Sequence, residues 1–560
     1  YDQTCATEKR RRRKRGTMVE PAKRVVINEL VCEGCGDCSV QSNCLSVEPV
    51  ETEFGRKRRI NQNTCNKDYS CVKGFCPSFV TVEGGQLKSA KKKADPGRPD
   101  PFALPALPEP VLPLSANDDA PARPWGIVVA GVGGTGVITI GQLLGMAAHL
   151  EGKGIVTQDS AGLAQKGGAT WSHVQIANRA EDICTTKVGT AEADLVIGCD
   201  PIVAANKATL AVMREGRTYV AVNTHGAPTA AFVSNPDWQF PAGNCEAAVA
   251  AAAGAANVGA LDADQLAVQL IGDSLYTNPL LLGYAWQNGK VPLSRAALLR
   301  SIELNGVQVD NNKLAFEWGR RAAHDLAAVH AVLKPAQVIE FVKKTVNVDE
   351  TIAKRVEFLT AYQNAAYAAD YQSFVEKVRA AEAPLGTKKL TEAVARYLFK
   401  LMAYKDEYEV ARQHTDTGFL EQIATRFEGD YKVHYHLAPP SIAKKNDQGE
   451  LIKQKFGPWM HGAFKVLARL KGLRGTAFDP FGRTGERRTE RALIGEYRAA
   501  IDELLRTLSP ANLTLAVEIA RIPEDIRGYG HVKDRHLKAA RPKWGALMAE
   551  WRSGGQRKAA

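Results

Sequence analysis

Short apolar runs alternate with a helical pattern through the middle of the chain. Residues 127–130 are a continuous apolar run that predicts a buried strand, and apolar positions at three- and four-residue spacings over 137–150 predict a helix. Further strand-like runs lie at 155–158, 195–198 and 218–223. Because strands that alternate with helices are typical of α/β folds, we expect an α/β domain over residues 125–330.

A different pattern fills the C-terminal part of the chain. Apolar residues recur at helical spacing over 351–381, 390–427 and 486–508, with few strand-like runs between them. We therefore expect a mostly helical C-terminal domain over residues 331–560. His434 and His436 would share one face of a short strand-like stretch, but no Asp, Glu or Cys lies near enough in sequence to favour a metal site there.

A proline-rich segment precedes the α/β pattern. Nine of the 27 prolines fall between Pro96 and Pro124. Because proline favours extended polyproline geometry, residues 94–124 are expected to be a linker between two domains.

Cysteines are concentrated on the N-terminal side of that linker. Seven of the 11 cysteines lie in one short stretch, namely Cys32, Cys35, Cys38, Cys44, Cys65, Cys71 and Cys76. A C-x2-C-x2-C run followed by a distant Cys-Pro is typical of ferredoxin-like modules, and Gly34 and Gly36 permit the tight backbone that such a run needs. The pattern predicts a small iron–sulfur module over residues 25–93 that carries electrons.

Two other interpretations of the cysteines fit less well. A disulfide framework suits a small secreted domain, whereas this chain has 560 residues and no secretory signal. Zinc favours two ligand pairs, whereas here a third cysteine follows the first pair at once and no histidine lies between Cys32 and Cys76.

The number of clusters stays open. Cys76 would complete one four-iron site with Cys32, Cys35 and Cys38. A second centre built from Cys44, Cys65 and Cys71 would then lack one ligand. Asp68, Cys5 or water would have to supply that ligand, or the centre would have to lack one iron.

The positive charge is concentrated in the same part of the chain. Of the net +12, a surplus of 8 lies in residues 1–98, which hold 20 Lys and Arg against 12 Asp and Glu. The cationic runs are Lys9 to Arg15, Arg56 to Arg59 and Lys91 to Lys93. Because no aromatic residues interleave with them, we do not expect a nucleic acid partner. An acidic redox protein steered to the cluster is expected instead, with Arg56 to Arg59 as a candidate docking patch.

No apolar run reaches the roughly 18 to 20 residues that a membrane helix needs, so no membrane association is expected. Thiols that hold an oxygen-sensitive cluster suit a reducing compartment. Together these features predict a cytoplasmic protein.

A glycine-rich loop follows the first strand of the α/β pattern. Gly131, Gly133, Gly134 and Gly136 fit G-x-G-x-x-G between a predicted strand and a predicted helix, where glycines let the backbone approach an anion. Asp159 ends the next strand, where a ribose-binding acid would be expected. By itself this pattern predicts an NAD or FAD site.

A second glycine block changes that prediction. Lys166, Gly167 and Gly168 precede another apolar strand, and a dinucleotide domain does not need them. Because ligands of open α/β sheets lie at the carboxyl ends of the strands, we expect the first loop, this block and the segment from Asn223 to His225 to face one crevice. His225 is a candidate base, although a loop histidine is commonly just solvated.

Taken together, these motifs resemble a known family. The chain resembles 2-oxoacid:ferredoxin oxidoreductases, and among them the long fused bacterial form that acts on indolepyruvate. The resemblance rests on the cysteine module, the loop from Gly131 to Gly136, the Lys166 block, and the stretch from Asn278-Pro-Leu-Leu-Leu-Gly283 to Ala315-Phe316 and Gly319. Lys166 stands where the family carries Arg, which keeps the charge but loses the bidentate fork.

The resemblance implies a reaction. These enzymes decarboxylate a 2-oxoacid on thiamine diphosphate with Mg, transfer the acyl group to coenzyme A, and pass electrons through 4Fe-4S clusters to ferredoxin. It also implies that the glycine-loop domain is the Rossmann-like gamma-type domain, which helps to enclose the active site and is not known as an NAD site. A homodimer is expected.

One part of that machinery is missing from the sequence. The Gly-Asp-Gly thiamine motif does not occur in the 560 residues, so we expect it upstream, with residues 1–24 as the basic tail of that domain. The C-terminal domain resembles a helical extension of fused members. The alternative from another class is an iron–sulfur electron-transfer subunit joined to a genuine NAD- or FAD-binding domain.

Overall fold

The structure is a computed structural model that describes residues 8–9, 12–13, 16–88, 100–114, 123–161, 168–226, 232, 235–333, 347–439, 443–447 and 449–554. The chain divides into two compact units. The first, here called the α/β unit, comprises residues 1–20, 62–66 and 89–338. The second, here called the cysteine–helical unit, comprises residues 21–61, 67–88 and 339–560.

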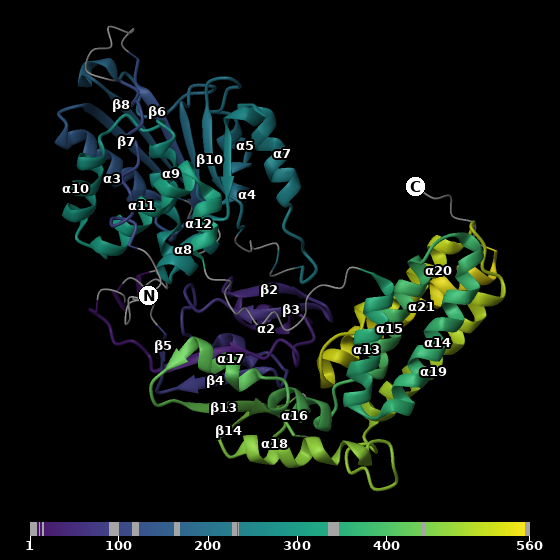
Figure 1. The fold of residues 1–560 in the computed structure, drawn as a ribbon. Coiled ribbons are helices and arrows are strands. Elements are labelled where there is room, and N and C mark those ends of the chain that lie inside the picture. Colours follow the sequence, from purple (N-terminus) through teal and green to yellow (C-terminus); the bar gives the residue numbers. More distant parts are fainter. Residues whose placement is uncertain are drawn as a thin grey trace. The chain divides into compact units, whose positions relative to one another are not determined.

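A six-stranded sheet forms the centre of the α/β unit, in the order β11-β10-β9-β6-β8-β7 (Figure 1). Its strands are β6 (Trp125–Val132), β7 (Gly154–Ala161), β8 (Ala169–Ala177), β9 (Leu195–Gly198), β10 (Tyr219–Asn223) and β11 (Val258–Leu261). Strands β6, β9, β10 and β11 are parallel, whereas β8 runs antiparallel to both β6 and β7. The predicted α/β fold is confirmed, but the antiparallel insertion of β8 was not anticipated.

Helices cover both faces of this sheet. They are α3 (Val137–Leu150), α4 (Pro201–Ala204), α5 (Lys207–Leu210), α7 (Ala242–Ala253), α8 (Ala263–Ile271), α9 (Thr277–Gln287), α10 (Arg295–Asn305), α11 (Val309–His324) and α12 (Leu326–Val332). Because side chains alternate along a strand, Ile127 and Val129 of β6 pack in the core with α3, α9 and α11, while Val128 packs in the core with α7.

Two glycines let α9 and α11 cross closely. A Cβ atom added to Gly283 would lie 2.0 Å from the carbonyl oxygen of Phe316, and one added to Gly319 would lie 1.9 Å from that of Leu280. Both distances are far below van der Waals contact, so only glycine fits at these positions. This close packing gives a physical reason for the two glycines in the stretch from Asn278 to Gly319, which carries part of the family resemblance.

Part of the predicted linker 94–124 packs on the α/β unit. Gln287 Nε2 donates to the carbonyl oxygen of Pro108 at 2.7 Å, and Arg321 donates to those of Pro101 and Pro105. Leu104, Leu112 and Leu114 lie against the apolar core. Residues 100–114 are therefore attached along α9 and α11 and do not form a free extended spacer.

In the cysteine–helical unit, an antiparallel sheet joins two distant parts of the sequence. Its order is β1 (Lys23–Ile27), β4 (Phe79–Glu83), β13 (Lys432–Leu437) and β14 (Gln454–Phe456). Val80 of β4 pairs with Tyr435 of β13, which in turn pairs with Phe456 of β14. The expected helical C-terminal domain therefore contributes two strands to the sheet of the expected iron–sulfur module.

Smaller elements complete the cysteine-rich part. They are α2 (Asp37–Ser42), the 3-10 turn η1 (Ser70–Lys73), the hairpin of β2 (Val47–Thr52) and β3 (Gly55–Ile60), and the pair of β5 (Gln86–Leu87) with β12 (Phe427–Glu428).

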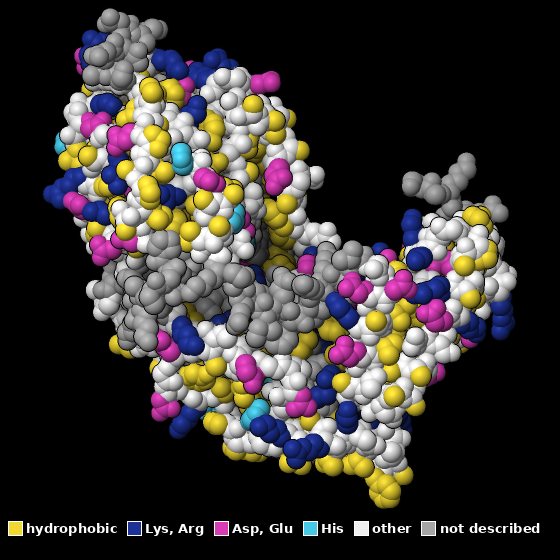
Figure 2. Space-filling model, in the orientation of Figure 1, with side chains coloured by type: hydrophobic (Ala, Val, Ile, Leu, Met, Phe, Trp, Pro, Cys, Tyr) yellow, Lys and Arg dark blue, Asp and Glu magenta, His cyan; other side chains and the backbone are white. Residues whose placement is uncertain are grey.

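The rest of this unit is helical, as predicted. One bundle contains α13 (Val348–Tyr362), α14 (Ala365–Glu382), α15 (Lys389–Met402), α19 (Gly485–Arg506), α20 (Leu513–Arg521) and α21 (Gly530–Arg552). The core beside the sheet is completed by α16 (Glu407–Thr415), α17 (Phe419–Arg426) and α18 (Met460–Arg469). Figure 2 shows acidic and basic side chains interspersed over the bundle surface. Within the described residues, no helix is both long enough and apolar enough to cross a membrane.

Candidate functional site

Four cysteines from two loops line one cavity in the cysteine–helical unit. Cys32, Cys35 and Cys38 come from the loop after β1 and the start of α2, and Cys76 comes from the loop before β4. The remaining lining residues are Ile27, Glu33, Gly36, Asp37, Arg58, Gly74, Phe75, Ser78 and Phe79. These four cysteines are the set that the sequence pattern grouped into one four-iron site.

Glycines shape both loops. Gly34 and Gly36 adopt φ values of 65° and 81°, in the left-handed region that favours glycine. A Cβ added to Gly74 would lie 2.7 Å from the Cα of Cys38, so Gly74 lets the second loop approach the first. The backbone N–H of Phe75 donates to Asp37 Oδ2 at 2.7 Å and fastens the two loops together.

The chemistry of this donor set fits an iron–sulfur cluster. Burial raises the pKa of the Cys35 and Cys38 thiols, and the neighbouring thiols raise it further. The Cys35 and Cys38 thiols would thus resist ionisation unless a bound cation stabilised their thiolates. In the described part of the chain, no three His, Cys, Asp or Glu side chains are placed around a single metal ion. A cubane spaces its four thiolates more widely than one ion does.

Two cations, Arg58 and Lys453, lie beside the cysteine loops. Arg58 lines the cavity and is 1% exposed. Lys453 Nζ donates to the carbonyl oxygens of Gly74 at 2.5 Å and Cys76 at 3.0 Å. Burial lowers the pKa of Lys453, and the thiols of Cys76 and Cys38 oppose that shift. Lys453 lies 377 residues from Cys76 in sequence, and the sequence pattern gave no indication of it.

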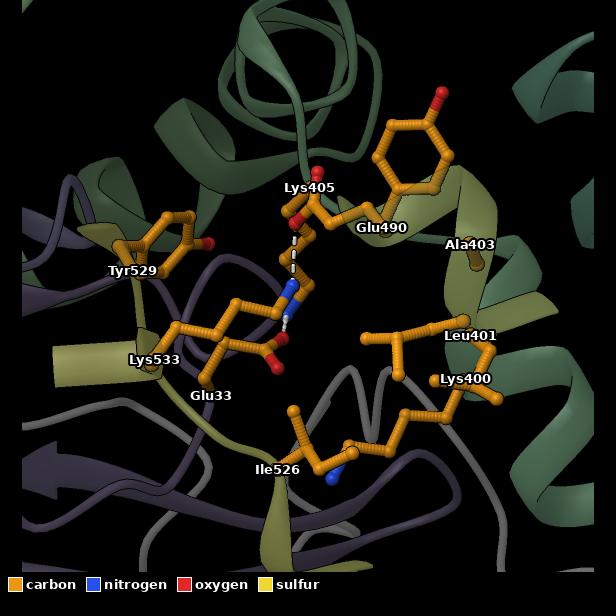
Figure 3. A pocket seen from close by; sticks show the side chains of 12 residues that line it. Glu33, Lys400, Leu401, Ala403, Lys405, Glu490, Ile526, Tyr529 and Lys533 are labelled. Carbon is orange, nitrogen blue, oxygen red and sulfur yellow. Dashed lines mark hydrogen bonds and ion pairs between the residues drawn. The ribbon is translucent and has the colours of Figure 1, made fainter. Parts of the chain in front are cut away.

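A second charged cavity adjoins Glu33 (Figure 3). Lys405 Nζ lies 2.5 Å from Glu33 Oε1 and also donates to the carbonyl oxygen of Cys32 at 3.2 Å. Lys533, which lines the same cavity, pairs with Glu490. Burial would raise the pKa of Glu33, but Lys405 and other nearby lysines hold it at about 2. Glu33 is therefore a carboxylate beside the cysteine loop.

The expected docking patch at Arg56 to Arg59 is wrong for two of its four cations. Lys57 and Arg58 are buried, with exposures of 6% and 1%. Arg56 Nε lies 2.5 Å from Glu51 Oε1, across the β2–β3 hairpin. Because side chains alternate along a strand, Lys57 and Arg58 point to opposite faces of β3, so both faces of the strand are covered at these positions. Of the other cationic runs, only Lys9, Arg12 and Arg13 lie within the described residues.

The remaining cysteines are placed elsewhere. Cys44 follows α2, Cys71 is buried in η1, and Cys65 belongs to residues 62–66, which group with the α/β unit. None of the three is among the described residues that line the cavity. Asp68 is exposed and accepts hydrogen bonds from Ser70, and Cys5 lies outside the described residues.

In the α/β unit, the two glycine blocks meet. The backbone N–H of Gly133 donates to the carbonyl oxygen of Gly168 at 2.8 Å. Gly134 and Gly136 adopt φ values of 83° and 102°, which the turn from β6 into α3 requires, and Gly131 packs against Val137 and Cys199. Lys166 and Gly167 lie outside the described residues.

Hydrogen bonds of the Asn223 side chain hold the loop that follows β10 in place. Asn223 Oδ1 accepts from the backbone N–H of His225 at 3.2 Å and of Ala263 at 3.0 Å. His225 Nε2 lies 4.0 Å from Asp264 Oδ2. Asn223 and His225 therefore lie at the carboxyl end of a parallel strand, the position expected for them.

The strand order disfavours a dinucleotide site. Strand β8 lies between β6, which carries the glycine loop, and β7, which carries Asp159. With neighbouring strands about 4.8 Å apart, Asp159 is displaced by about 10 Å across the sheet instead of lying on the adjacent strand. A ribose-binding acid belongs on the strand next to the glycine loop, so Asp159 does not fit that role.

Two family models match the chain. Residues 126–322 match the family described as "Pyruvate ferredoxin/flavodoxin oxidoreductase". Residues 348–546 match the one described as "Family of unknown function (DUF6537)".

Two individual relatives each match about a third of the chain. The chain is 28% identical over 201 residues to "Indolepyruvate oxidoreductase subunit IorB" of Methanothermobacter thermautotrophicus, covering 36% of this chain and 97% of the relative. The protein of the same name from Thermococcus kodakarensis is 27% identical, with coverages of 36% and 98%.

Among solved structures, the pyruvate oxidoreductase subunit PORC of Thermotoga maritima has a TM-score of 0.27 at 20% identity, covering 36% of this chain and 96% of that one. The gamma subunit of a keto/oxoacid ferredoxin oxidoreductase from Geobacter sulfurreducens has a TM-score of 0.25 at 21% identity, with coverages of 36% and 98%.

Proposed function

We propose that the chain is a member of the 2-oxoacid:ferredoxin oxidoreductase family and the electron-transfer part of an enzyme that oxidises an aryl 2-oxoacid of the indolepyruvate type and reduces ferredoxin. The names of the relatives support the substrate class. The family reaction yields an acyl-coenzyme A, and the thiamine diphosphate step is assigned to a part of the enzyme outside these 560 residues, which contain no Gly-Asp-Gly motif.

The observation that carries the proposal is the convergence of four thiols on one cavity. We assign Cys32, Cys35, Cys38 and Cys76 as the ligands of a 4Fe-4S cluster. When bound, such a cluster accepts and releases single electrons. The chain holds the thiols in place through Gly34, Gly36 and Gly74, and most of the lining residues are buried.

The other predicted site residues receive separate roles. The number of clusters stays open, and Cys44, Cys65 and Cys71 stay the predicted ligands of a second centre that would lack one ligand. Gly131, Gly133, Gly134, Gly136 and Gly168 shape the end of the α/β sheet that would face the active site. Lys166 and Gly167, outside the described residues, stay predicted residues of the same site. The active enzyme is proposed to be a homodimer.

The alternative is an iron–sulfur subunit with a genuine NAD or FAD domain. The glycine loop between β6 and α3 favours it, but the insertion of β8 removes Asp159 from the position that such a domain uses. The oxidoreductase without a nicotinamide site is therefore the better supported function.

Iron analysis of the anaerobically purified chain tests the proposal. The protein should be brown and contain at least about four irons per chain. Cys35→Ala should remove about four irons, whereas Cys184→Ala, at an exposed cysteine, should remove none. Equal iron contents in the two variants would contradict the assignment of the cavity.

A further inference from the structure

We propose that the C-terminal region, in its described residues 347–439, 443–447 and 449–554, forms a wall of the cluster site, and that Lys453 raises the reduction potential of the cluster bound there. This inference rests on the proposed cluster at Cys32, Cys35, Cys38 and Cys76. It assigns a role to the region that matches a family of unknown function.

The C-terminal region contacts the first cysteine loop through its backbone. Tyr529 Oη donates to the carbonyl oxygen of Val31 at 2.6 Å, and Lys405 Nζ donates to the carbonyl oxygens of Val31 at 3.3 Å and Cys32 at 3.2 Å. Val31 is fully buried against Val410 and Tyr529. Residues that precede α16 and α21 thus position the segment that carries Cys32.

The second cysteine loop is held in the same way. Lys453, just before β14, donates to the carbonyl oxygens on both sides of Phe75, those of Gly74 and Cys76. Its ammonium also lies 4.5 Å from the centre of the Phe79 ring. The ring of Phe75 lies against His531 at 4.5 Å, so α21 covers this loop as well. Both loops that supply thiols are therefore enclosed by residues from beyond position 400.

The charges around these loops favour an anion. Lys57, Arg58, Lys405 and Lys453 lie next to the cysteine loops, whereas the neighbouring carboxylates are Glu33 and Asp37. Buried charges are stable only when compensated. A cluster held by four thiolates is an anion, and it would add negative charge beside these cations.

Lys453 contacts the loop of Cys76 without being tied to a carboxylate in the described residues. Lys405, in contrast, is paired with Glu33. Because reduction adds one negative charge to the cluster, a nearby buried cation stabilises the reduced state more than the oxidised state. Loss of the Lys453 charge should therefore lower the potential, whereas the paired Lys405 should contribute less.

Redox titration of the full anaerobic chain, followed by electron paramagnetic resonance, tests this inference. Lys453→Met should retain its iron and shift the reduced-to-oxidised ratio at a fixed potential at least tenfold towards the oxidised form. For a one-electron couple this is a shift of about 59 mV to lower potential. Lys453→Arg, which keeps the charge, should titrate like the wild type.

Lys455→Met is the matched control. Lys455 lies two residues away on β14, is 42% exposed at its side chain and pairs with Glu83. It should leave the potential unchanged.

Each outcome decides a separate question. Lys453→Met with full iron and an unchanged potential would overturn the inference while leaving the proposed function intact. A wild-type chain without iron would overturn the proposed function itself. If Lys453→Met loses its iron, Lys453→Gln is compared with Lys453→Arg, and equal potentials in those two variants would also overturn the inference.

Discussion

The Nε2 atom of His414 lies 3.0 Å from the carbonyl oxygen of Pro77, the residue that follows Cys76. On its other side, His414 Nδ1 lies 3.2 Å from Asn28 Nδ2, at the start of the first cysteine loop. An amide can only donate to Nδ1, so the neutral imidazole carries its proton on Nε2 and donates it to Pro77. One buried, neutral histidine of α16 therefore links both cysteine loops.

This arrangement predicts a loss of stability in acid. Burial lowers the pKa of His414 to about 4, and it lowers that of His436, which contacts Thr81, to about 4 as well. Between pH 6.5 and 4 the unfolded chain binds protons that the folded chain does not, so the free energy of unfolding falls as the pH drops through this window. His414 alone accounts for about 3 kcal/mol.

Urea denaturation at pH 7, 5.5 and 4.5 measures this dependence. His414→Gln should be less stable at pH 7 but lose less stability on acidification than the wild type. His149→Gln, at an exposed histidine of α3, should keep the wild-type dependence. A wild-type-like dependence in His414→Gln would contradict the prediction.

A buried ion pair fixes the start of α16. Arg474 forms two hydrogen bonds with Asp406, at 2.5 and 2.9 Å, and Asp406 caps the helix. We expect Arg474→Met to destabilise the protein by about 3 to 5 kcal/mol, because it leaves a buried carboxylate without its cation. Thermal denaturation should show this loss, whereas Arg498→Met, which breaks the partly exposed pair with Asp370, should cost less than about 1 kcal/mol.

Two glycine-to-alanine changes should have opposite signs. Gly319→Ala forces α11 away from α9 and should cost about 3 kcal/mol by overpacking. Gly495 lies within α19, and nothing lies within 4 Å of an added Cβ. Gly495→Ala should therefore stabilise by about 1 kcal/mol through helix propensity. Denaturation midpoints of the two variants test the prediction, and a shift in the same direction for both would refute it.

The glycine loop of the α/β unit should not bind dinucleotides. Isothermal titration with NAD, NADP and FAD is expected to give no binding in the micromolar range, because Asp159 is two strands away from the loop. Saturable binding that Gly133→Val abolishes would instead favour the alternative function, whereas binding that this variant retains would point to a different site.

Local patterns in the sequence determined much of this protein. The range predicted for the helix at 137–150 is that of α3, and the range predicted for a strand at 195–198 is that of β9. The spacing of Cys32, Cys35 and Cys38, the glycine turns and the helical periodicity of the bundle are also local, because turn geometry and side-chain alternation depend only on nearby residues.

Contacts between distant residues were decided only by the tertiary structure. Nothing near Cys76 indicates that Lys453 contacts its loop. The cationic run at Arg56 to Arg59 suggested an exposed patch, whereas packing on both faces of β3 buries Lys57 and Arg58. The insertion of β8 beside β6 likewise follows from strand pairing, which depends on partners far along the chain. A sequence pattern records which face of an element is apolar, but the partner that covers that face is selected by packing in the folded chain.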